Sequence, residues 1–67
     1  MKNVTETQDG KFKVGDKVQT TMAAVAAGCE DESFIVKDII CDGFGCVLLK
    51  EKDGRGYGEH YLEHYDS

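Results

Sequence analysis

The sequence predicts an all-β protein, a small five-stranded antiparallel barrel. Three observations lead to this prediction. Short apolar runs alternate with turns that contain Gly and Asp, β-branched residues concentrate in the middle of the chain, and no segment sustains the hydrophobic period of a helix. Because isolated pairs of strands this short are only marginally stable, we expect all of them to share one core.

The length of the chain, 67 residues, is enough for one domain and leaves no material for a second core. Residues 1–10 are polar and show no periodicity, so we expect them to form a flexible N-terminal tail. Residues 11–67 make up the single predicted domain, and its strands are expected between residues 12 and 63.

The first predicted strand spans residues 17–22. It follows Gly15 and Asp16, a dipeptide typical of turns. Residues 22–27 are rich in alanine and precede Gly28, which favours a short helical turn inside a long loop.

The strongest strand signal is FIVKDIIC, which is rich in β-branched residues and has turn residues on both sides. Phe34 and Val36 would lie on the same face of this strand, whereas Ile39 is an odd number of positions away. If all three side chains belong to the core, the strand must bend or bulge near Asp38, as strands of small barrels do.

Two further turns, DG at 42–43 and DG at 53–54, predict two successive hairpins. Between them, Val47 and Leu49 alternate with their neighbours and are expected to face inward. The closing segment, residues 60–63, is compatible with a helical or 3₁₀ turn or with a last short strand. The predicted core consists of Val14, Val18, Phe34, Val36, Ile39, Val47, Leu49 and Leu62.

The succession KVGDKV, FIVKDI, DGFGCVLL, DGRGYG and YLE resembles the small SH3-like barrels of the KOW and Tudor kind, which include bacterial and phage proteins of similar length. The resemblance covers residues 12–63 and implies an SH3-like five-stranded barrel. It also implies a module that binds proteins, peptides or RNA, or that sits beside a larger enzyme. Such barrels rarely catalyse reactions.

The net charge of −5 argues against direct binding of nucleic acid. Affinity for a phosphate backbone comes mainly from Lys and Arg, and the eight basic residues here are scattered along the chain.

No apolar run approaches the ~20 residues that cross a bilayer, so we expect no contact with a membrane. Three cysteines, an odd number, are typical of free thiols in a reducing compartment and predict a cytoplasmic location.

One motif points in another direction: Cys41, Cys46, His60 and His64 have a spacing close to that of a zinc finger. A finger needs a helix that runs into its first histidine, but residues 53–59 contain three glycines, which disfavour a helix. We therefore expect no metal and no cofactor. The cysteines are interpreted as small buried residues and the histidines as surface residues.

No cleft or oxyanion hole accompanies any carboxylate pair or any Cys–His pair in the sequence, so we predict that the protein is not an enzyme. We expect a monomer or weak homo-oligomer that acts as a protein-interaction module. It could be a small phage or mobile-element inhibitor whose acidic surface binds a basic protein. The alternative is an accessory subunit that docks on a larger enzyme; a zinc- or nucleic-acid-binding module comes third.

The predicted contact region is the acidic loop before the strongest strand. Its charges are expected to join Asp38 and Asp42 in one negative region, and tyrosines are expected to add apolar contact. The candidate partner-binding residues are Glu30, Asp31, Glu32, Tyr61 and Tyr65.

Overall fold

Seven strands, one α-helix and one 3₁₀ turn make up the computed structural model, which describes residues 2–52 and 54–65. In chain order the elements are β1 (Lys2–Val4), β2 (Lys17–Thr20), α1 (Met22–Ala26), β3 (Ser33–Ile35), β4 (Asp38–Asp42), β5 (Gly45–Leu49), β6 (Gly56–Gly58), η1 (Glu59–Tyr61) and β7 (Leu62–His64).

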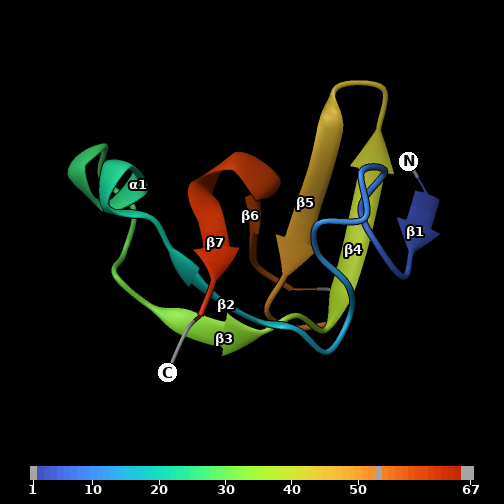
Figure 1. Cartoon of the computed structure of the whole chain (residues 1–67), viewed down its shortest axis with the longest axis horizontal. Coiled ribbons are helices and arrows are strands. Elements are labelled where there is room, and N and C mark those ends of the chain that lie inside the picture. Colours follow the sequence, from blue (N-terminus) through green and yellow to red (C-terminus); the bar gives the residue numbers. More distant parts are fainter. Residues whose placement is uncertain (1, 53, 66–67) are drawn as a thin grey trace.

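The strands form two antiparallel sheets (Figure 1). The four-stranded sheet has the order β1-β4-β5-β6, and the three-stranded sheet has the order β3-β2-β7. The all-β prediction is confirmed. The closed five-stranded barrel is wrong, because the strands separate into two sheets that do not join into a closed ring.

A break at Val36 and Lys37 divides the predicted long strand between the two sheets. β3 before the break pairs with β2, and β4 after it pairs with β1 and β5. The backbone at the break finds partners outside the ladders: Val36 N–H donates to Asp16 O at 2.9 Å, and Lys37 N–H donates to Leu49 O at 2.8 Å. Gly15 N–H donates to Val36 O at 2.9 Å, from a backbone with φ of +98° that favours glycine. The bend expected near Asp38 therefore exists and falls just before that residue.

Residues 1–10, expected to be a flexible tail, contribute a strand to the larger sheet: β1 pairs with β4. Farther along, Thr7 is buried, and its hydroxyl donates to Asp9 Oδ1 at 2.8 Å and accepts from Phe12 N–H at 3.2 Å. Within the described residues, this segment thus packs on the same domain as the later strands.

The helical turn expected in residues 22–27 is present as α1. The first predicted strand, residues 17–22, is two residues too long because Thr21 caps the helix instead. Its hydroxyl accepts from Ala24 N–H at 3.1 Å, as N-cap threonines do. Both alternatives for the closing segment are realised, since η1 leads directly into β7.

The core lies between the two sheets. Of the predicted core, Val18, Val36, Ile39, Leu49 and Leu62 are buried and Phe34 is partly buried, but Val14 and Val47 are 42% and 40% exposed. The main cluster of buried apolar side chains is Phe12, Val18, Val36, Ile39, Cys41, Cys46, Leu48 and Leu62.

The register of the β4–β5 hairpin explains the error at Val47. Ile39 lies opposite Leu48, and Cys41 lies opposite Cys46. Paired residues point to the same face of a sheet, so Leu48 follows Ile39 into the core and Val47 points to the other face.

The second predicted turn contains Asp53, which lies outside the described residues. On either side of that position, Gly54 N–H donates to Glu51 O at 3.1 Å, and Lys50 N–H donates to Arg55 O at 2.8 Å. No helix among the described residues has the length and hydrophobicity needed to span a membrane.

Neighbouring positions of β5 provide a stability test. Replacing the fully buried Leu48 by Ala should cost about 2–5 kcal/mol, which is most of the stability of a domain this small. Val47→Ala, on the exposed face, should change the free energy of unfolding by less than ~0.5 kcal/mol. Urea denaturation measures both, and equal effects would contradict the register.

Candidate interaction surface

The β4–β5 hairpin carries a disulfide between Cys41 and Cys46, whose Cα atoms are 4.0 Å apart. The two residues are direct cross-strand partners and face the core. The expectation of three free thiols is therefore wrong: only Cys29 remains free. The cytoplasmic location stays a prediction, and this finding removes one of its supports.

The zinc-finger residues do not converge on a metal site. The two sulfur atoms that would bind zinc are bonded to each other. The His64 ring stacks on Phe12 with a centroid distance of 4.8 Å, and its Nε2 lies 2.6 Å from Lys11 O. His60 is exposed on η1. Among residues 2–52 and 54–65 no group of three or more His, Cys, Asp or Glu side chains could hold a metal ion.

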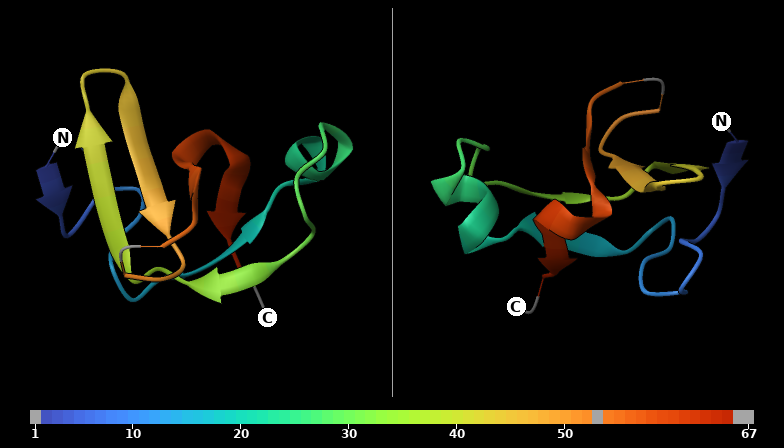
Figure 2. Two further views of the ribbon diagram at one scale, coloured as in Figure 1. Left: turned by 180° about the vertical axis from the view of Figure 1, so that it is seen from behind. Right: turned by 90° about the horizontal axis from the view of Figure 1, so that it is seen from above.

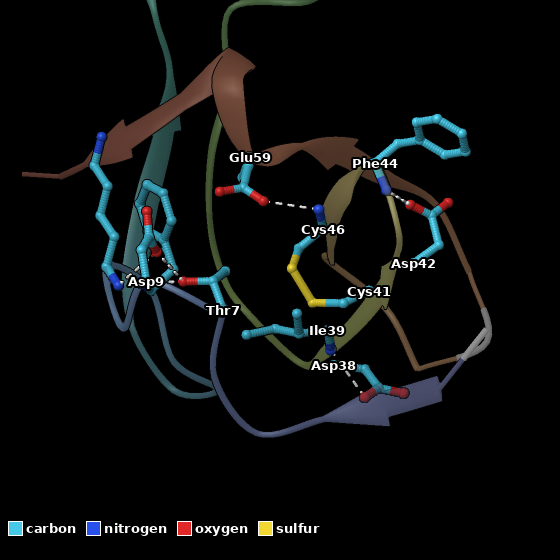
Figure 3. Close-up of a disulfide and its surroundings, with 11 residues drawn as sticks. Thr7, Asp9, Asp38, Ile39, Cys41, Asp42, Phe44, Cys46 and Glu59 are labelled. Carbon is cyan, nitrogen blue, oxygen red and sulfur yellow. Dashed lines mark hydrogen bonds between the residues drawn. A yellow bond between two sulfur atoms is a disulfide. The ribbon is translucent and has the colours of Figure 1, made fainter.

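Phe44 stands at the tip of this hairpin and is 99% exposed. Gly43 and Phe44 form the loop between Asp42 and Gly45, which are paired. Asp42 Oδ1 accepts from Phe44 N–H at 2.7 Å, and Gly45 has a φ of +146°. Figure 3 shows the phenyl ring pointing away from the disulfide, with Asp42 beside it. The sequence therefore presents a large apolar side chain to solvent on a cross-linked turn.

A shallow groove of about 220 Å³ runs from Phe44 along the outer side of the sheet. We call it the hairpin groove; it is lined chiefly by Asp42, Phe44, Val47, Gly58, Glu59 and His60. Val47 lies opposite Gly58 in the β5–β6 pairing, and glycine leaves the groove open there. The Tyr61 ring, 48% exposed, lies against Gly58: its Cδ2 is 3.5 Å from where a Cβ at that position would be.

Two carboxylates are fixed at the rim of the hairpin groove. Glu59 Oε2 accepts from Cys46 N–H at 2.7 Å, a backbone donor that lies beyond the end of the β5–β6 ladder. Asp42 is held through Oδ1 by Phe44 N–H. Within the described part of the chain, no hydrogen bond engages the second oxygen of either carboxylate. These oxygens remain available to a partner.

The acidic loop is only partly free. Glu30 and Asp31 are exposed, but Glu32 Oε1 pairs with Lys50 Nζ at 2.8 Å and Glu32 Oε2 accepts from the Tyr57 hydroxyl. Hydrogen bonds from Lys50 and then from Tyr57 hold the pKa of Glu32 below its usual range. Because Lys50 and Tyr57 belong to the four-stranded side and Glu32 precedes β3, this carboxylate links the two sheets.

Contrary to the expectation from the sequence, Asp42 does not join the acidic loop in one negative region. Figures 1 and 2 place the loop between α1 and β3 at the opposite end of the molecule from the β4–β5 tip, where Asp42 lies. Asp38 is at the start of β4, and its Oδ2 accepts from Asn3 Nδ2 at 2.6 Å. The strand assumed to join these charges belongs to two sheets, so they are separated.

The two candidate tyrosines lie in different surroundings. Tyr61 lies against Gly58, one of the residues that line the hairpin groove. Tyr65 follows β7, and Lys17 Nζ lies 4.4 Å from the centre of its ring, a cation–π contact. Cys29 lines a different cavity, of about 350 Å³, with Lys50, Arg55 and Tyr57. A Cys–His pair with a free thiol would need Cys29 beside a histidine. His60 lines the hairpin groove instead, so the structure does not bring Cys29 and His60 to one cavity.

The candidate contact residues predicted from the sequence do not include Phe44, although its position in the turn indicates that it is exposed. In a hairpin whose loop is the dipeptide 43–44, an aromatic residue at position 44 cannot reach the core. Comparisons of the chain with protein-family models, with curated proteins and with solved structures found no match.

The contribution of Tyr57 to the free energy of unfolding should be lost as the pH rises from 10 to 12. Its hydrogen bond to Glu32, with its burial, raises the pKa of Tyr57 from 10.0 to about 12. The folded state thus retains a proton that the unfolded chain has already lost. This contribution is complete below the unfolded pKa and disappears as the pH passes the folded one. Denaturant unfolding at increasing alkaline pH should show a steeper loss for the wild type than for Tyr57→Phe, and identical slopes would contradict the network.

The disulfide can be tested by alkylation of the denatured protein. Without a reductant, iodoacetamide should add to Cys29 alone, and after reduction it should also add to Cys41 and Cys46. Intact-mass spectrometry counts the adducts. Full modification of all three cysteines in protein that was never reduced, from cells lysed with the alkylating agent present, would show that the pair is not bonded.

Proposed function

We propose that this protein is a non-enzymatic protein-interaction module that binds its partner through the hairpin groove. The observation that carries the proposal is Phe44, a large apolar side chain that is 99% exposed at the tip of a turn. Exposed aromatic residues next to other apolar groups are typical of contact sites.

The surroundings of Phe44 support a role in binding. Val47 and the Tyr61 ring add exposed apolar surface next to the same groove. The disulfide joins the two strands directly below the turn, so little conformational entropy remains to be lost at the tip when a partner binds. Aromatic side chains that become buried at the centre of an interface often contribute most of its binding energy.

A protein partner is favoured over nucleic acid by the charges at the rim. Asp42 and Glu59 flank the groove, and the chain as a whole carries a net charge of −5. A phosphate backbone would be repelled there, since binding to it depends on lysine and arginine. The earlier candidate Tyr61 stays in this proposal, and the acidic loop is replaced by the rim carboxylates.

The resemblance to SH3-like barrels supports the same function. In small barrels, a strand that bends can switch from one sheet to the other, and the segment 33–42 does so here. We propose that the chain is an opened relative of such barrels, with β7 returning to pair with β2. Binding of proteins or peptides is a common role of that family.

Phe44→Ser should abolish capture of the partner. Tagged wild type and variant are used to recover proteins from the source cell, and recovered proteins are identified by mass spectrometry. Val14→Ser is the matched control, because Val14 is also exposed, at 42%, but lies outside the hairpin groove. Both variants should keep the wild-type circular dichroism spectrum and thermal midpoint.

The expected result is one or more proteins that are recovered by the wild type and by Val14→Ser, but not by Phe44→Ser. Equal recovery by all three proteins would exclude the groove as the contact site. Loss of the partner with both variants would also contradict the proposal, since it would point to a general effect of removing apolar surface.

A further inference from the structure

We infer that the segment which binds the hairpin groove is a basic stretch of protein chain, in which one bulky apolar side chain has lysine or arginine residues close on either side. This inference rests on the proposed function and names the chemistry of the partner. It follows from the size of the groove, from the charges at its rim and from the burial of Phe12, the aromatic residue that lies between two lysines of this chain.

The size of the groove suits a single side chain. Its volume of about 220 Å³ compares with the ~150 Å³ of an apolar protein cavity that accommodates benzene. Val47 supplies an apolar wall, and Gly58 opposite it leaves the floor without a side chain. Phe44 stands at one end, so an apolar residue seated in the groove could pack against the phenyl ring.

The charges at the rim of the groove favour basic residues next to the apolar side chain of the partner. Asp42 and Glu59 each use one oxygen to accept a backbone N–H, which fixes the orientation of the carboxylate. Among the described residues that line the groove there is no lysine or arginine, and His60 is the one basic side chain. A basic partner would therefore meet two fixed carboxylates, whereas an acidic one would be repelled by both.

The stretch of this chain with the most suitable chemistry is not available on a second copy. Lys11, Phe12 and Lys13 place an aromatic residue between two lysines. Phe12 is, however, fully buried in the core, so the folded protein cannot present it. Val14, exposed next to Lys13, is a smaller side chain. We therefore assign the basic stretch to a different protein.

Three short peptides test this inference on the full oxidised chain. The probe is acetyl-Lys-Gly-Trp-Gly-Lys-amide; one control replaces both lysines by Glu, and the other replaces Trp by Ser. Each is titrated into ¹⁵N-labelled protein, and backbone amide signals are followed by NMR. The probe should shift the signals of Gly45, Val47 and Gly58. Its apparent Kd should be at least about fivefold lower than that of the glutamate control, as expected for two exposed ion pairs. It should also be lower than that of the serine control, which keeps the lysines and loses the apolar side chain.

Added salt should weaken binding of the probe, because exposed charges are screened. The probe should bind Val14→Ser normally and fail to shift Phe44→Ser. Equal binding of the glutamate peptide or of the serine peptide would overturn the inference, as would shifts confined to other parts of the chain. Concentration-dependent shifts of the same amides without peptide would also overturn it, in favour of self-association.

Failure of this inference is distinguishable from failure of the proposed function. If Phe44→Ser loses its captured partner while the peptides show no preference for the basic probe, the groove is the binding site and its partner has another chemistry. If Phe44→Ser keeps its partner, the groove itself is excluded whatever the peptides do.

Discussion

The break at Val36 and Lys37 is the constraint on which the rest of the structure depends. A continuous strand from 33 to 42 would belong to one sheet and would expose Ile39 if Phe34 and Val36 were buried. The break shifts the alternation of inward- and outward-facing side chains by one residue, so Val36 and Ile39 both enter the core. It is possible only because the interrupted backbone groups find partners in Gly15, Asp16 and Leu49, which come from both sides of the core.

The β4–β5 hairpin, which begins after this break, determines which side chains are exposed around the hairpin groove. Once β4 is placed with Ile39 inward, its partner β5 must turn Leu48 and Cys46 inward and Val47 outward. The same register brings Cys46 opposite Cys41, where the disulfide ties the strands together one pair below the loop. Phe44 is left at the tip with no core within reach. The buried and exposed features of the hairpin thus have one geometric origin.

Some carboxylates of this protein are engaged in contacts that hold the fold together, and others keep an oxygen free for a partner. Glu32 is committed to Lys50 and Tyr57, where it links the two sheets, so a run of three acids is not one free patch. Asp42 and Glu59 are far apart in sequence, yet both border the hairpin groove. Each is held by a backbone N–H at the end of a strand or turn. Acidic residues that are adjacent in the sequence therefore need not form one free negative surface.

The sequence by itself determined the all-β class, the hairpin turn at 42–43 and the need for a bend, because these depend on β-branched residues, on glycines and on the spacing of Val36 and Ile39. It could not place Phe12 in the core or Val47 on the surface. Phe12 stands alone between two lysines with no period to mark it, and the inward face of β5 is set by its register with β4. Tertiary structure alone decided that 33–42 divides between two sheets and that Tyr61 and Glu59 meet the hairpin. Strand pairing and sheet membership are long-range contacts, and no local pattern encodes them.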